Sequence, residues 1–183
     1  GRWPELGSTE DRVWMGRFIG RLHSIGSART FVQRPVLDVE TFGVDARATV
    51  LDSGFLPEYL VDRYAEVSGT LLGRLAEELQ PQLARARLRI HGDCHRGNIL
   101  WTDAGPHFVD LDDCVTGPAV QDLWMLLAGS REEMRVQAAD LLEGYGQFAA
   151  FNLAELGLIE PLRALRLIHY AAWLARRWHD PAF

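Results

Sequence analysis

The chain has 183 residues, of which 48% are apolar and 24% charged, a composition typical of a globular protein. Its 25 acidic and 19 basic residues give a net charge of −6, which excludes the basic surface expected of a nucleic-acid-binding protein. No apolar run approaches the roughly 18 residues of a membrane span, and the first residues do not have the pattern of a signal peptide. We therefore expect a cytoplasmic protein whose partners include neither nucleic acid nor membrane.

Two residue types, cysteine and lysine, are informative because they are scarce. Cys94 and Cys114 are too few for a disulfide framework, so we expect free thiols in a reducing compartment. All 19 basic residues are arginine, the chain contains no lysine, and its first residue is glycine rather than methionine. We interpret the chain as a piece of a longer protein.

In the first half of the chain, apolar residues recur at helical spacing in two places. Residues 10–25 are expected to form an amphipathic helix that stops at Gly26, and a long helix is expected from Pro57 to the residues before Pro81. A Gly-x-x-x-Gly motif in the first helix predicts close packing against another helix. Residues 27–44 show no clear pattern and are expected to be irregular.

The second half of the chain predicts three further helices. Residues 119–127 have a helical pattern, and Ser130 with Glu133 forms the sequence signature of a capping box at the start of the next helix. The last helix follows Asn152 and ends near Asp180. It is apolar on more than half of its circumference, so we expect it to be buried.

A polar segment lies between these helical regions. The runs LRI, NILW and HFVDL predict short strands, and the turn TDAGP joins the last two into a β-hairpin. Asp93 and Asn98 stand five residues apart on the loop before the hairpin, and Asp110 follows at its end. Gly92 and Gly97 give the loop backbone the freedom to take a tight path.

This layout fits phosphoryl transfer. Such a reaction needs a base against the acceptor hydroxyl and hard oxygen ligands for magnesium, but little covalent chemistry from the protein. We interpret Asp93 as the base that accepts the proton. Asn98 and Asp110 are interpreted as the magnesium ligands.

The segment HGDCHRGNILW resembles the H-G-D-x-H-x-G-N catalytic loop of the aminoglycoside-phosphotransferase-like kinases, a branch of the protein-kinase-like fold. FVDLDD resembles the metal-binding segment of that family, and GPAVQDLWMLL, GLIEPLRALRL and WLARRWHDPAF resemble its bacterial stress-response serine/threonine protein kinases. The resemblance implies the same roles for Asp93, Asn98 and Asp110. It also implies that Asp122 is the helix aspartate that holds the backbone of the catalytic loop. Arg96 stands where the wider family has proline or a small residue, which leaves open which substrate the loop admits.

The remaining polar residues of the segment have weaker assignments. We expect His91 to be structural, with its ring packed beneath the loop, and His95 to contact a phosphate or to brace the loop. Asp112 could share a strand face with Asp110 and support it, whereas Asp113 is expected to be solvated. No functional role is expected for the other histidines: His23, His107, His169 and His179.

The resemblance implies a mainly helical α+β fold, the C-terminal lobe of the protein-kinase-like fold, with a short β-hairpin next to the catalytic loop. We expect residues 1–183 to form this single domain. The N-terminal lobe, with its glycine-rich loop and its lysine over the ATP phosphates, is expected to be missing, so the isolated chain is expected to be inactive.

The expected reaction is transfer of the ATP γ-phosphate, with Mg, to a serine or threonine hydroxyl of a protein. Because a small alcohol presents the same hydroxyl to the same base, the alternative is a small-molecule kinase acting on an aminoglycoside, choline or homoserine. A kinase-like domain without turnover is a third hypothesis. The fourth is a transition-metal hydrolase that uses His91, Asp93 and His95 with Cys94 or Cys114.

Overall fold

The computed structural model describes residues 5–180, which fall into two compact units. The first unit comprises the chain up to Val36 and the stretch Ala86–Gly157, and the second comprises Leu37–Arg85 and the chain from Leu158. Each unit is therefore built from two separate stretches of sequence. None of the helices in this described part is long and apolar enough to cross a membrane.

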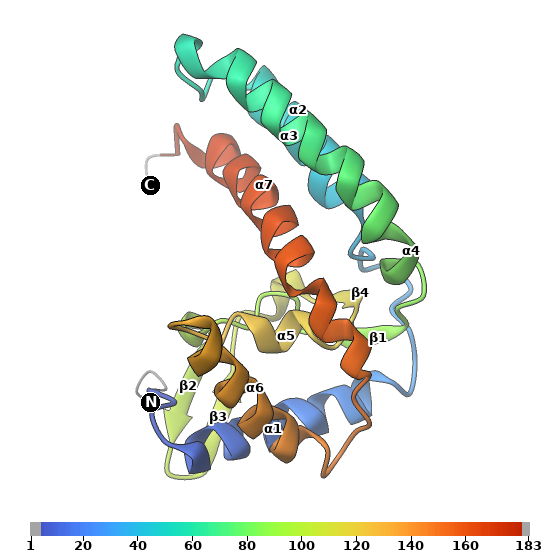
Figure 1. Ribbon diagram of the computed structural model, residues 1–183, viewed down its shortest axis with the longest axis vertical. Helices are drawn as coiled ribbons and strands as arrows, with labels where there is room; N and C mark the ends of the chain where they lie inside the picture. The colour runs from blue at the N-terminus through green and yellow to red at the C-terminus, as the bar shows by residue number, and fades with distance from the viewer. Residues whose placement is uncertain (1–4, 181–183) are drawn as a thin grey trace. The chain divides into compact units, whose positions relative to one another are not determined.

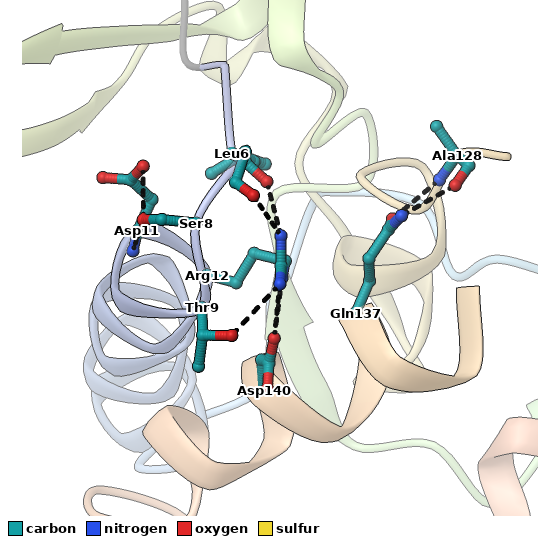
Figure 2. Close-up of polar contacts among 9 residues, drawn as sticks. Leu6, Ser8, Thr9, Asp11, Arg12, Ala128, Gln137 and Asp140 are labelled. Atoms are coloured by element: carbon teal, nitrogen blue, oxygen red, sulfur yellow. Dashed lines mark hydrogen bonds and ion pairs between the residues drawn. The ribbon is translucent and has the colours of Figure 1, made fainter. Parts of the chain in front are cut away.

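Two helices of the first unit, α1 (Thr9–Gly26) and α6 (Arg131–Tyr145), lie side by side (Figure 1). The Ser8 hydroxyl caps the start of α1 by accepting a backbone N–H of its first turn. Arg12 then joins the two helices, because its guanidinium lies 2.8 Å from the Asp140 carboxylate (Figure 2). The first helix is thus confirmed within a residue or two of its predicted ends.

Glycines allow α1 and α6 to approach until their backbones touch. A Cβ atom on Gly16 would lie 2.0 Å from the carbonyl oxygen of Leu141, and one on Gly144 would lie 1.9 Å from that of Val13. Gly20 faces the α6 backbone in the same way. The close helix packing predicted from the Gly-x-x-x-Gly motif is confirmed.

The predicted capping box at the start of α6 is also confirmed. The Ser130 hydroxyl accepts the backbone N–H of Glu133, and the Glu133 carboxylate accepts the N–H of Ser130 at 2.7 Å. Hydrogen bonds to its carboxylate from the side chain and then the backbone of Ser130 lower the pKa of Glu133 from its ordinary value.

In the described part of the first unit, four short strands form two antiparallel pairs. They are β1 (Leu88–Ile90), β2 (Ile99–Thr102), β3 (Gly105–Phe108) and β4 (Val115–Gly117). β2 and β3 form the predicted hairpin, with Ile99 opposite Phe108. The first strand pairs with β4, which no sequence pattern predicted because three residues are too short to show an alternation.

The second half of this unit is less helical than the sequence predicted. The helix expected over residues 119–127 shortens to α5 (Gln121–Trp124), and 3-10 turns occur at η2 (Arg96–Asn98), η3 (Leu111–Asp113) and η4 (Leu153–Leu158). The hairpin is fixed to α1 by aromatic contact, with the rings of Trp14 and Trp101 edge to face at 5.4 Å.

The second unit is helical. Its elements are the π-helix η1 (Glu40–Val44), α2 (Asp45–Asp52), α3 (Glu58–Glu78), α4 (Gln80–Leu83) and α7 (Ile159–Arg177). The long helix from Pro57 is confirmed, whereas the π-helix replaces the end of the stretch expected to be irregular. The prediction that the last helix is buried is wrong for part of its surface, because Leu167 is 66% and Tyr170 48% exposed. The mainly helical α+β class, with a hairpin beside the polar loop, is confirmed.

Candidate active site

The loop after β1 leaves little room for a side chain at two glycines. Gly92 has a φ of +86°, and a Cβ atom there would lie 2.3 Å from the carbonyl oxygen of Asp113. At Gly97, a Cβ atom would lie 2.6 Å from the imidazole ring of His95, which folds back over the loop. The two glycines therefore set the tight path that the sequence suggested.

The loop orients Asp93 through two neighbouring side chains. The Nδ2 amide of Asn98 donates to the Asp93 backbone oxygen at 3.1 Å and to its Oδ2 at 3.3 Å. His95 accepts the N–H of Gly97 at its Nδ1, so in the neutral ring the proton is on Nε2, which lies 3.4 Å from the same Oδ2. The structure thus gives His95 the geometry of a loop brace next to Asp93.

The β-hairpin returns Asp110 to this loop. The N–H of Val109 donates to the Asn98 backbone oxygen at 3.0 Å, and His91 donates from Nε2 to the carbonyl oxygen of Val109 at 2.9 Å. Because Val109 is held on both sides, the next residue, Asp110, is fixed close to Asn98. The side chain of His91 is buried, in keeping with the structural role expected of it.

Asn98 and Asp110 fit the oxygen chemistry of a magnesium site. Since the nitrogen of the Asn98 amide is engaged with Asp93, its Oδ1 remains as the atom able to bind a cation. Asp110 is exposed, and within residues 5–180 its carboxylate makes no side-chain cap hydrogen bond to the turn that follows. Amide and carboxylate oxygens are the ligands that magnesium prefers.

Asp122 holds the loop from beneath. It is fully buried on α5, its Oδ2 accepts the N–H of His91 at 2.7 Å, and its Oδ1 accepts the N–H of Gly92 at 2.8 Å. The carboxylate therefore bonds the backbone of the loop immediately before Asp93.

His23, to which the sequence assigned no role, completes this support. Its Nε2 lies 2.9 Å from Oδ2 of Asp122 and its Nδ1 lies 3.0 Å from the hydroxyl of Tyr145. Burial, helped by the negative charges of Glu155 and Asp122, raises the pKa of Tyr145, so its hydroxyl keeps its proton. The signal that was available is spacing: His23 continues the buried face of α1 one turn after Ile19.

The neighbouring polar residues take no part in this arrangement. The expectation that Asp112 shares a strand face with Asp110 is wrong, because residues 111–113 form a 3-10 turn and not a strand. Both Asp112 and Asp113 are exposed. The guanidinium of Arg96 lies at a long 3.4 Å from the backbone oxygen of Leu126.

The cysteines are not activated nucleophiles. Both thiols are free. Burial raises the pKa of Cys94 well above its ordinary value and, to a smaller extent, that of Cys114, so both remain protonated near neutral pH.

The transition-metal hypothesis is not supported. Among residues 5–180 no three His, Cys, Asp or Glu side chains come together as a group able to hold a metal ion. The imidazoles of His91 and His95 instead bond the loop and hairpin backbone.

Comparison with known proteins identifies the family. A model of the phosphotransferase enzyme family matches residues 6–159. The chain belongs to this family. All 183 residues of this phosphotransferase-family chain also align with stress response kinase A of Escherichia coli at 44% identity, and with the serine/threonine protein kinase RdoA of Salmonella typhimurium at 45% identity. The chain spans 55% of the length of each of these relatives.

Solved structures of other proteins share the fold. An amicoumacin kinase, solved with AMP-PNP, Ca2+ and Ami, matches 96% of the chain and 54% of its own length with a TM-score of 0.61 at 18% identity. A spectinomycin phosphotransferase, solved with ADP and its antibiotic, matches 94% of the chain and 56% of its own length with a TM-score of 0.59 at 16% identity. At these identities the likeness shows the fold alone, which is that of a kinase-like lobe.

Proposed function

We propose that the protein containing this chain is an ATP-dependent phosphotransferase that transfers the γ-phosphate to a serine or threonine hydroxyl of a protein substrate. The observation that carries the proposal is the geometry of one loop and one hairpin. Asn98 bonds the Asp93 backbone oxygen and carboxylate with its amide nitrogen, while its own backbone oxygen accepts the N–H of Val109, the residue before Asp110. The whole-chain similarity to stress response kinase A supports the same reaction class.

In this proposal Asp93 accepts the proton of the acceptor hydroxyl as phosphoryl transfer proceeds. Asn98 and His95 keep its carboxylate turned to the acceptor side. The oxygens of Asn98 and Asp110 would hold magnesium, which would neutralise charge on the ATP phosphates. Asp122 supports the loop and touches no substrate.

The protein acceptor is proposed from the longer similarity and not from the site. Asp93 presents the same carboxylate to a protein hydroxyl and to a small alcohol, and the solved neighbours include kinases of small molecules. A small-molecule kinase is therefore the alternative that the test must separate. A kinase-like domain without turnover is the other outcome, although Asp93, Asn98 and Asp110 are all present and brought together.

The test uses the full-length protein with γ-labelled ATP and a bacterial lysate, followed by separation of labelled proteins from labelled small molecules. We expect label on serine or threonine of protein. Label on a small alcohol alone would replace the protein acceptor with the alternative, and no label in either fraction would refute the transfer.

Asp93→Asn tests the assigned base in the same assay. It should lower turnover by about 10²-fold or more, because a positioned base contributes about 10² to 10⁴. Asp103→Asn, at the exposed tip of the hairpin, is the matched control and should leave turnover unchanged. Turnover of Asp93→Asn within threefold of the parent would refute the assignment.

A further inference from the structure

The side chain of Gln121 contacts the loop at the peptide bond that leads into Asp93. Gln121 is buried at the start of α5, and its Nε2 donates to the carbonyl oxygen of Gly92 at 2.7 Å. The N–H of the same glycine donates to Oδ1 of Asp122 at 2.8 Å. Two consecutive residues of α5 thus hold both backbone polar groups of Gly92.

The orientation of the Gln121 amide is fixed by a third residue. The indole N–H of Trp124 points to Oε1 of Gln121 at 3.1 Å. Because an indole nitrogen only donates, the amide atom that it meets must be the oxygen. The amide nitrogen is consequently the atom that faces Gly92. Rotation of the amide by half a turn would place Oε1 against the carbonyl oxygen of Gly92, so that two acceptors would face each other.

The hydrogen bond from Gln121 matters because the backbone of Gly92 is less restricted than that of the residues around it. It has a φ of +86° and no side chain to limit its backbone. Asp122 holds the N–H groups of His91 and Gly92, both of which precede the Gly92–Asp93 peptide bond. The bond from Gln121 is made to the carbonyl oxygen of that peptide bond itself, so it helps to set the plane from which the Asp93 side chain departs.

We propose that Gln121, oriented by Trp124, is a positioning residue for Asp93. The inference rests on the proposed function of Asp93 as the base. A base displaced by about 1 Å can lose about 10²-fold in rate, so loss of the Gln121 bond acts on the chemical step. The hydrogen bonds described for Gln121 go to Gly92 and Trp124 and not to Asn98 or Asp110, so we expect a smaller effect on nucleotide binding than on turnover.

The test is Gln121→Glu in the full-length protein, with release of ADP from Mg-ATP measured and dephosphorylated casein as the acceptor. The ionised carboxylate keeps the size of the side chain and still accepts the Trp124 N–H, but it cannot donate to Gly92. Because a protonated carboxyl can donate, Gln121→Met, which has no donor in any protonation state, is measured beside it. We expect kcat to fall about 10- to 100-fold while the KM for Mg-ATP stays within about twofold of the parent.

Gln137→Glu is the matched control. Gln137 makes the same kind of contact elsewhere, because its Nε2 donates to the backbone oxygen of Ala128 at 2.8 Å (Figure 2). This substitution should leave kcat unchanged.

Trp124→Phe should lower kcat by less than Gln121→Glu. The double variant Gln121→Glu/Trp124→Phe should lose no more activity than Gln121→Glu alone, because the two side chains act as one unit.

A second readout does not depend on the reaction. Hydrogen exchange of the backbone amides of residues 91–95 should be faster in Gln121→Glu and unchanged in Gln137→Glu. A kcat within twofold of the parent overturns the proposal, whether or not exchange changes. A fall in kcat with unchanged exchange also overturns it.

If Gln121→Glu does not fold, Gln121→Met, which keeps the length without the donor, serves both measurements. Failure of Asp93→Asn to lower turnover would instead refute the assigned base, and the exchange result would still show whether Gln121 holds the loop.

Discussion

Asp110, one of the two proposed magnesium ligands, has an unusual backbone conformation. Its φ of 59° and ψ of 63° place a non-glycine residue in the left-handed region, at a cost of about 1–3 kcal/mol. The bonds on both sides of Val109 hold this conformation in place. The strain is thus located at a residue whose side chain faces outward with no cap bond to the turn that it precedes.

Asp110→Ala should weaken magnesium and nucleotide binding together, because the carboxylate would be a direct ligand of the cation. The measurement is calorimetric titration of the full-length protein with AMP-PNP at several magnesium concentrations. Asp113→Ala, an exposed carboxylate of the same acidic stretch, is the control. A magnesium dependence equal to that of the parent would contradict the assignment of Asp110.

Asp122→Ala should lower both stability and turnover. The substitution leaves the buried N–H of His91 and the part-buried N–H of Gly92 without their acceptor, and an unpaired buried donor costs about 1–3 kcal/mol. Urea denaturation of the full-length protein measures the free energy of unfolding, and the ATP assay measures turnover. A loss of turnover with unchanged stability would mean that Asp122 acts on substrate and not on the loop.

At the scale of elements, the sequence predicted the helices and strands that have a local sequence signal. Such signals are the helical spacing around Phe18, the capping box at Ser130 and the hairpin turn, and the structure contains all three elements. The pairing of β1 with β4 joins residues from distant parts of the chain, so no local pattern reveals it. The same holds for the site: motif spacing indicated Asp93, Asn98 and Asp110, whereas the supporting contacts of His23 and Gln121 depend on helix packing.

Glu155 of the 3-10 turn η4 forms a hydrogen bond with the turn before α5. Oε2 of Glu155 accepts the N–H of Val120 at 3.1 Å. Burial raises the pKa of Glu155 above its ordinary value of 4.5, although hydrogen bonds from Val120 and Ala119 and the charge of His23 act in the opposite direction. The folded protein therefore binds this proton more tightly than the unfolded chain.

Glu155→Gln should remove a pH dependence of stability. A raised pKa in the folded state means that the stabilisation is present at low pH and is lost as pH rises from 4.5 through the raised value. Glutamine keeps an oxygen to accept the N–H of Val120 but does not ionise. The free energy of unfolding of the parent, minus that of the variant, should decrease with rising pH in urea titrations of the full-length protein. A difference that is constant across this range would show that Glu155 does not titrate there.

At the scale of the whole molecule, the chain spans 55% of its curated relatives and contains no lysine. Kinases of this fold contact the ATP phosphates with a lysine and a glycine-rich loop. We propose that residues 1–183 are the lobe that carries the base and both magnesium ligands, and that a further lobe of the same protein completes the nucleotide site.

The isolated 183 residues should therefore bind ATP weakly and turn it over far more slowly than the full-length protein. Both quantities are measured by calorimetry and ADP release on the two polypeptides side by side. Circular dichroism of the shorter one controls for folding. Comparable activity of the two would show that the nucleotide site is complete within this chain.

The backbone contact between α1 and α6 has a consequence for genetics. A Cβ atom at Gly16, Gly20 or Gly144 would overlap a carbonyl group of the facing helix, so even alanine, the mildest substitution, forces the two helices apart. Because α1 carries His23 and α6 carries Tyr145, separation of the helices disturbs the contacts that support the loop before Asp93. If Asp93 is the base as proposed, a random screen for inactive alleles should recover these glycines alongside it, although no glycine side chain exists to take part in the chemistry.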